Sequence, residues 1–210
     1  VPISDGLQIG NGSSAIYLRT NAPLSYLESG QPIRVDEPFY FALSYGKPSD
    51  AESVASALRV RDLTVDGWRA WAKSCALPSF ASLPVLRSAL CLKLHAYKDT
   101  GAIIAAATTS IPEAVRSERT WDYRYCWLRD AYYALEAFRL LGHFEERENF
   151  TVFLLNIAGD HPDLALAPLY RVDGTRDLDE RILAHWPGFN GDGPVRVGNA
   201  AASQVQHDIF

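Results

Sequence analysis

The period of the hydrophobic residues changes once along this chain, and that change limits the folds open to it. Up to about residue 48, apolar residues fall in short or alternating runs separated by turn sequences rich in Gly, Asn and Pro. These runs are 15–18, 25–27, 33–35 and 39–45. Short strands at roughly ten-residue spacing are typical of an antiparallel β-sandwich. Beyond Pro84 the apolar residues recur every three or four positions, which is the period of an amphipathic helix.

The helical part contains three clear apolar stripes. They cover residues 86–97, 128–141 and 150–157, and Gly142 and Gly159 are expected to end the second and third. Shorter helices are expected at 178–186 and from Asn199 onward. Because the strands come first and the helices afterwards, the sequence predicts two separate domains rather than a mixed α/β layer.

We assign three regions on this basis. Residues 1–48 form the β domain, residues 49–83 form a linker with short helices, and residues 84–210 form the helical domain. A helix-start pattern at residues 49–52 opens the linker.

Composition excludes several classes of function. The chain is 48% apolar and 21% charged, which suits a globular protein, and its net charge of -5 gives no reason to expect a nucleic acid or an anionic membrane as a partner. The longest uncharged apolar stretch, residues 102–112, is about half of the ~20 residues that a membrane span needs. Three widely spaced cysteines among apolar neighbours predict small buried side chains in a reducing compartment, and hence a cytoplasmic location. The histidines show no metal-ligand spacing, so no metal is expected.

Residues 119–130 have the most distinctive composition. They include two Trp, two Tyr, three Arg and two Asp, just ahead of the second helical stripe. Aromatic rings can cover the apolar face of a sugar, while Arg and Asp side chains bind adjacent hydroxyls in pairs. Aromatic rings and ion pairs that merely brace the start of a helix would produce the same composition, so composition alone leaves both interpretations open.

Residues 121–130, Trp-Asp-Tyr-Arg-Tyr-Cys-Trp-Leu-Arg-Asp, resemble the signature of glycoside hydrolase family 15, the group of glucoamylases, glucodextranases and trehalases. Residues 87–94, 100–106 and 108–113 resemble upstream blocks of that family. Residues 194–201, with Gln204, Gln206 and Asp208, resemble a downstream block. Several ordered motifs are far more specific than one pattern match. Because family members continue further in both directions, the resemblance implies a fragment truncated at both ends.

The resemblance also implies a fold and a set of binding residues. The fold would be the C-terminal part of an antiparallel β-sandwich followed by the first part of an (α/α)6 barrel. Four residues fall on positions that line the pocket for the terminal glucose: Tyr123, Trp127, Arg129 and Asp130.

Other residues near this signature have less direct roles. Asp122 and Arg124 are expected to brace the side chains that touch the sugar. Trp186 and Arg196 lie in a block that approaches the sugar site beyond the cleaved bond, although nearby glycines also fit an ordinary turn-rich loop.

By resemblance, the function is that of an inverting, exo-acting α-glucosidase of the glucoamylase type, which uses water and no organic cofactor. Its substrate would be an α-glucosyl oligosaccharide or disaccharide of the maltooligosaccharide, dextran or trehalose kind. Inversion requires two carboxyl groups about 6.5–9.5 Å apart. In the family both are glutamates later in the helical domain, so no catalytic residue is expected before Phe210. Two alternatives stay open: a non-catalytic sugar- or partner-binding relative resembling the regulatory subunits of phosphorylase kinase, and an unrelated (α/α)6 protein that binds a polysaccharide.

Overall fold

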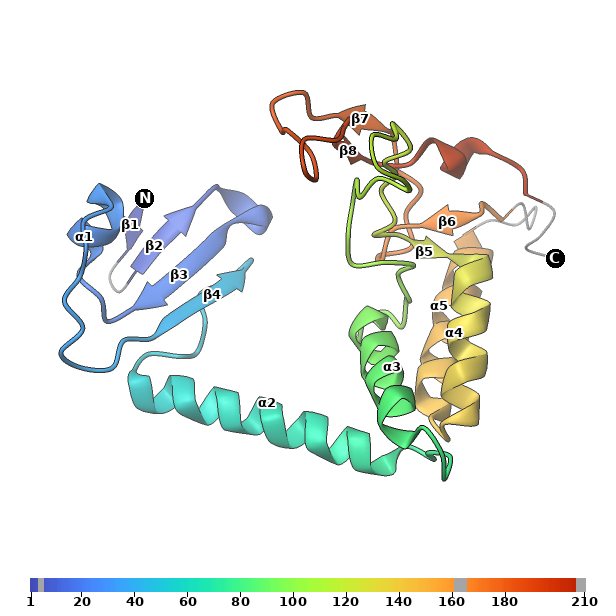
Figure 1. The fold of residues 1–210 in the computed structure, drawn as a ribbon, viewed down its shortest axis with the longest axis horizontal. Coiled ribbons are helices and arrows are strands. Elements are labelled where there is room, and N and C mark those ends of the chain that lie inside the picture. The colour runs from blue at the N-terminus through green and yellow to red at the C-terminus, as the bar shows by residue number, and fades with distance from the viewer. Residues whose placement is uncertain (4–5, 161–165, 207–210) are drawn as a thin grey trace. The chain divides into compact units, whose positions relative to one another are not determined.

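The computed structural model describes residues 1–3, 6–160 and 166–206 (Figure 1). The chain folds into two compact units, Val1–Lys73 and Ser74–Phe210, which are described separately below. Strands dominate the start of the first unit and helices the start of the second, so the predicted combination of a β part followed by an α part is confirmed at this level. The boundary between the units falls inside the segment that the sequence assigns to a linker.

The first unit contains a four-stranded antiparallel sheet in the order β1-β2-β3-β4. Its strands are β1 (Pro2–Ile3), β2 (Gly6–Ile9), β3 (Ile16–Thr20) and β4 (Phe41–Tyr45). A short 3-10 turn, η1 (Gly12–Ser14), connects β2 to β3. Along β4 every second residue is exposed, which places Phe41, Leu43 and Tyr45 on one apolar face of the sheet.

The predicted strands are only partly confirmed. The runs at 15–18 and 39–45 correspond to β3 and β4, whereas β1 and β2 were not foreseen. Residues 33–35 form no strand, and residues 25–27 lie in a helix.

That helix is α1 (Leu24–Ser29), and its end signals explain the error. Pro23 stands immediately before its first residue, where a missing N–H costs nothing. Gly30 ends it in the left-handed region, with φ 67°, and donates its N–H to the carbonyl of Tyr26. A Pro before and a Gly after a six-residue run therefore favoured a helical turn over a strand.

The segment after the sheet is one long helix, α2 (Val54–Ser74), rather than the short helices predicted. Ser53 and Ser56 form a reciprocal cap at its start, since each hydroxyl accepts a hydrogen bond from the other residue's N–H. The structure describes α2 in full, and none of its 21 residues is buried.

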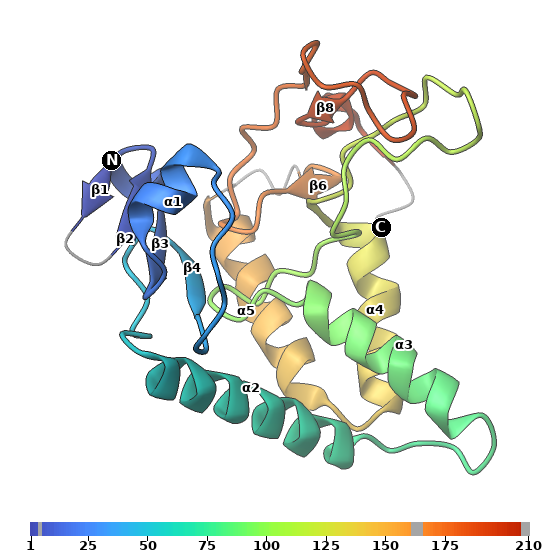
Figure 2. The same ribbon diagram turned by 60° about the vertical axis from the view of Figure 1, so that its left-hand side comes forward.

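The second unit begins with three helices that lie side by side in both views, α3 (Ser82–His95), α4 (Leu128–Leu140) and α5 (Phe144–Asp160) (Figures 1 and 2). The buried residues of α4 are Ala131, Ala134 and Phe138, spaced three and four apart as the sequence predicts. Gly142, with φ 83°, follows the end of α4 as expected. Gly159 does not end α5, which includes it.

The last part of the second unit differs most from the predictions. Residues 178–186 contain no helix but the short strand β7 (Arg181–Ile182), paired with β8 (Arg196–Val197). Among the described residues from Asn199 to 206, the 3-10 turn η2 (Ala200–Ser203) stands where a helix was predicted. Asp208, which belongs to the resembling block, lies outside the described residues.

A small core explains why residues 178–186 are extended. Strand β5 (Cys126–Trp127) pairs with β6 (Leu169–Tyr170), and Trp127 and Leu169 pack with Leu178. Leu178 is therefore anchored by residues distant in sequence, and the β7–β8 ladder then sets the backbone that follows.

The cysteines do not all follow the prediction of burial. Cys126 is buried, and desolvation raises the pKa of its thiol to about 12. Cys75 is only partly buried and Cys91 is exposed, so the prediction is wrong for Cys91. Within the described residues, none of the helices combines the length and the hydropathy needed to cross a membrane.

Candidate functional site

The distinctive segment between α3 and α4 is held as an extended loop by its own backbone. Residues 105–110 run alongside residues 121–125, because the N–H groups of Ala105, Ala106 and Ser110 donate to the carbonyls of Tyr125, Tyr123 and Trp121. The loop then continues into β5 and directly into the first turn of α4.

A second loop, residues 194–199, is fastened to this one. The side chain of Asn199 donates to the carbonyl of Asp122 over 3.0 Å, and the N–H of Gly198 donates to the hydroxyl of Tyr125 over 3.0 Å. The hydroxyl of Thr120, which is fully buried, donates to the carbonyl of Pro194 over 2.5 Å. Segments more than 70 residues apart in sequence are thus joined by specific hydrogen bonds.

Thr120 gives a direct test of this connection. The change Thr120→Val keeps the shape but removes the hydroxyl, which leaves the carbonyl of Pro194 without this donor. We expect a loss of about 1–2 kcal/mol in the free energy of unfolding, measured by urea denaturation. Thr151→Val on the exposed side of α5 is the matched control, because it removes a hydroxyl bonded to the carbonyl of Arg147 and should change stability by less than about 0.5 kcal/mol. Equal losses in the two variants would contradict a special role for Thr120.

Where the two loops meet, they enclose a cavity of about 310 Å³. Three aromatic side chains contribute to its lining, together with carboxylate and amide groups and two alanines. The lining residues are Trp121, Tyr123, Trp127, Glu180, Asn199, Ala200, Ala201, Gln204 and Gln206. Two of the predicted binding residues, Tyr123 and Trp127, are therefore brought together, with ring centroids 6.5 Å apart.

Arg129 and Asp130 lie beside this cavity, on the first turn of α4. Their side chains are joined by a hydrogen bond of 3.3 Å, and each is 41% exposed. The guanidinium of Arg129 lies 5.5 Å from the centroid of the Trp127 ring. Asp130 lines a different cavity, of about 390 Å³, together with Tyr133, and Arg129 lines neither cavity. The four residues predicted for the terminal sugar are thus linked by side-chain contacts, but only Tyr123 and Trp127 line the same cavity.

The two residues predicted beyond the cleaved bond are placed differently from each other. Arg196 stacks on the ring of Trp121 at 5.0 Å and forms an ion pair of 2.6 Å with Glu180, so it borders the cavity. Trp186 is 60% exposed and packs edge to face with His185. It is not among the described residues that line the cavity.

Ionisable neighbours fix the protonation of Tyr123. Burial raises the pKa of its phenol, and the carboxylate of Glu113 raises it further. The pKa of Glu113 is lowered, chiefly by its hydrogen bond from Arg119. Tyr123 therefore keeps its proton at neutral pH and its hydroxyl can donate a hydrogen bond.

Asp122 and Arg124 contact each other rather than the cavity. The guanidinium of Arg124 donates to both carboxylate oxygens of Asp122, over 2.9 and 2.8 Å, and Asp122 has no exposed surface. The two side chains hold each other in place, and their predicted role in bracing the sugar-binding side chains stays a prediction.

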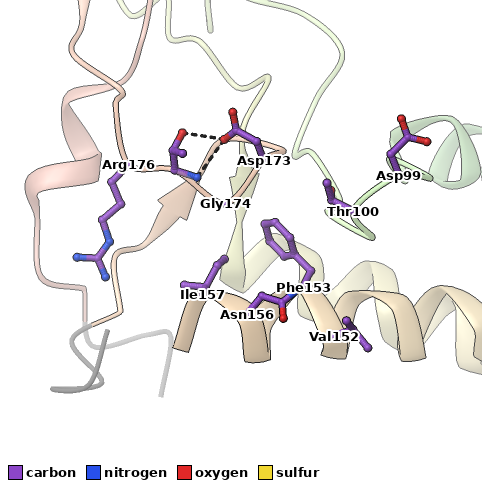
Figure 3. A pocket seen from close by; sticks show the side chains of 10 residues that line it. Asp99, Thr100, Val152, Phe153, Asn156, Ile157, Asp173, Gly174 and Arg176 are labelled. Carbon is purple, nitrogen blue, oxygen red and sulfur yellow. Dashed lines mark hydrogen bonds between the residues drawn. The ribbon is translucent and has the colours of Figure 1, made fainter. Parts of the chain in front are cut away.

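A larger cavity, of about 520 Å³, lies elsewhere in the second unit, between α5 and the loop after β6 (Figure 3). Phe153 and Ile157 of α5 line it, and Asp173 is already bonded to the N–H and hydroxyl of Thr175 in its own turn. All six predicted binding residues are described, and none lines it. In the described part of the chain, no three His, Cys, Asp or Glu side chains come together as a metal site would require.

The chemistry of the 310 Å³ cavity, which Trp121, Tyr123 and Trp127 line, suits an uncharged ligand rich in hydroxyls. Aromatic walls pack against the C–H faces of such a ligand, and nearby carboxylate, amide and guanidinium groups bind its hydroxyls. In a largely apolar cavity, a small number of such polar groups fixes the orientation of a small ligand.

Comparison with known proteins agrees with a site for a ligand rich in hydroxyls. The family model described as "Glycosyl hydrolases family 15" matches residues 81–210, so the chain belongs to that family. It is 40% identical to a trehalase of Mycobacterium tuberculosis over 81% of this chain and 26% of that protein. It is also 40% identical to a trehalase of Thermoplasma volcanium, over 74% of this chain and 24% of that protein. The chain thus spans about a quarter of the length of these relatives, and no solved structure matches it.

Trp121 and Glu180 are among the residues that line the cavity but were not predicted to bind sugar. Trp121 belongs to the same signature as Tyr123 and Trp127, so its composition signal was present but was not used. Glu180 sits in a polar stretch with no local signal, and only its ion pair with Arg196 reveals it.

Proposed function

We propose that this chain is the glucose-binding part of a longer glycosidase that hydrolyses an α-glucosidic bond, with α,α-trehalose as the substrate. The observation that carries the proposal is the shared cavity of Tyr123 and Trp127, with Arg129 stacked on Trp127 at its edge. The choice of trehalose is supported by the matched relatives, which carry the name trehalase.

Sugar binding would divide between rings and charged groups. Tyr123 and Trp127 would pack against the C–H face of the terminal glucose. Arg129 would donate to, and Asp130 accept from, adjacent hydroxyls, because a guanidinium and a carboxylate bind neighbouring hydroxyls in pairs. The hydrogen bond between Arg129 and Asp130 would hold the two groups ready for this task.

The hydrolytic step would use two carboxyl groups outside this chain, as the family resemblance implies. One would protonate the glycosidic oxygen as its bond to the anomeric carbon breaks. The other would take a proton from the water that attacks the opposite face of that carbon, which inverts its configuration.

We further assign the chain to part of a β-sandwich followed by part of an (α/α)6 barrel. The exposed apolar face of β4, with Phe41, Leu43 and Tyr45, supports a second sheet packed against it. An apolar cavity of about 490 Å³, lined by residues of α3 and α4 such as Leu92 and Leu140, supports a further helix packed there.

The anomers released from trehalose by the full-length protein test this function. With inversion, attack at one glucose yields β-glucose while the other glucose leaves as the α anomer, so proton NMR should first show equal amounts of both. A retaining enzyme would release only α-glucose at first.

Maltose and isomaltose serve as competing substrates, and a tenfold preference for either would overturn the choice of trehalose. Sugar binding without release of glucose would favour the non-catalytic relative.

A further inference from the structure

Trp121 is a cavity residue to which neither the sequence nor the family resemblance assigned a role. It lines the same hollow as Tyr123 and Trp127, so the cavity has three aromatic walls rather than two. Charged groups around its indole hold this ring in one orientation.

One edge of the indole is held by an acid. The Nε1–H of Trp121 donates to Oε1 of Glu113 over 3.2 Å. The other oxygen of Glu113 accepts from Nε of Arg119 over 2.5 Å, which fixes the carboxylate in turn. The hydrogen bond to Nε1–H limits rotation of the ring about its side-chain bonds.

A largely buried ion pair holds one face of the same indole. The guanidinium of Arg196 lies 5.0 Å from the ring centroid, within the range of a cation–π contact. Nη1 of Arg196 donates to Oε1 of Glu180 over 2.6 Å, and these side chains are only 15% and 18% exposed. The backbone of Arg196 is also fixed, since its N–H donates to the hydroxyl of Ser110.

An ion pair buried to this extent is a poor source of stability, because the cost of removing both charges from water offsets their attraction. Its clearer effect is to define one arrangement of the groups around it. Here that arrangement places a guanidinium against Trp121 and leaves the remaining surface of the indole to line the cavity.

We propose that Trp121 is a further sugar-binding residue, which stacks on the substrate, and that Glu180 and Arg196 are positioning residues that hold its ring. This inference rests on the proposed function and adds a specificity-determining wall to the same site. A ring already fixed loses little conformational freedom when a sugar packs against it, so its contact contributes fully to binding.

The full-length protein and trehalose provide the test. Trp121→Ala should raise KM about tenfold or more, as expected for loss of a central aromatic contact, while Trp121→Phe, which keeps a ring, should restore most of the affinity. Trp68→Phe, on the exposed helix α2, is the matched control and should leave KM and kcat unchanged. Circular dichroism and thermal melting of each variant separate lost contacts from lost folding.

A double-mutant cycle tests the positioning role. Glu180→Gln should raise KM several-fold with kcat changed less than about threefold, and should add little when Trp121 is already Ala, because it acts through that ring. Effects that simply multiply would show that Glu180 acts on its own and would overturn its role as a positioning residue. Acrylamide quenching of Trp121 fluorescence, obtained by difference from Trp121→Phe, should increase in Glu180→Gln.

The outcomes separate this inference from the proposed function. If the unaltered protein hydrolyses trehalose but Trp121→Ala keeps its KM, the stacking role is wrong and the proposed function stands. If the unaltered protein neither binds nor cleaves any α-glucoside, the proposed function is wrong and the stacking role falls with it. A KM that is raised in Trp121→Ala and returns towards the unaltered value in Trp121→Phe supports both.

Discussion

The change Asp130→Asn should lower kcat of the full-length protein on trehalose about 10²–10³-fold, with a smaller effect on KM. Asn keeps the size of the side chain but cannot form charge-assisted hydrogen bonds with sugar hydroxyls, and such bonds are about twice as strong as neutral ones. If the sugar ring distorts towards the transition state, hydrogen bonds to its hydroxyls strengthen, so their loss affects turnover more than ground-state binding.

The structure makes Asp130→Asn informative because the fold should survive it. Asp130 is 41% exposed, and it forms an ion pair with Arg129, which is equally exposed. Exposed ion pairs contribute at most about 1 kcal/mol, so a loss of activity would not be a loss of folding. Glu136→Gln removes an exposed ion pair with Arg139 on the same helix and is the matched control, with kcat expected to change less than twofold. A kcat within threefold of normal for Asp130→Asn would argue strongly against the proposed sugar site.

The change Gly198→Ala should destabilise the second unit by about 2–5 kcal/mol, because it combines backbone strain with a clash. Gly198 has φ 87°, a conformation that residues with a Cβ rarely adopt. A Cβ at this position would lie 2.1 Å from the carbonyl oxygen of Asp179 and 2.8 Å from that of Leu178. Since Gly198 directly precedes Asn199, which lines the cavity, any shift of the loop would disturb the cavity wall.

Gly191→Ala isolates the contribution of backbone strain. Gly191 has a similar φ of 82°, but a Cβ there would meet no atom within 4 Å. It should cost only about 1 kcal/mol, so urea unfolding of the two variants measures the clash by difference. If the two glycine variants prove equally stable, residues 178–179 and 198 do not pack as described.

The helices beside the site could be predicted because their signals are local. The stripe that includes Ala131, Ala134 and Phe138 repeats at the helical period, and Gly142 follows it with the positive φ that a helix end favours. Tyr123 and Trp127 were assigned to the site because their segment resembles the family signature, and the structure brings them together in one cavity.

The early strands and the last helices were less predictable. At residues 24–29 a Pro before and a Gly after the run favoured a helical turn, although the apolar residues also fit a strand. At residues 178–186 the apolar spacing fits a helix, but burial of Leu178 against Trp127 and pairing of β7 with β8 give an extended backbone. Tertiary contacts decided these cases because short segments have too small a local preference to resist them.

By itself, then, the sequence determined a β part followed by an α part, the amphipathic helices α3 to α5, the family, and the aromatic signature ahead of α4. Only the tertiary structure decided which side chains meet around the cavity. Trp121 and Arg196 are 75 positions apart and Glu180 has no local signal, yet the three form one contact group. The physical reason is that helical period and composition depend on residues close together in the sequence. A cavity instead forms where distant segments are joined by hydrogen bonds, such as that from Thr120 to Pro194.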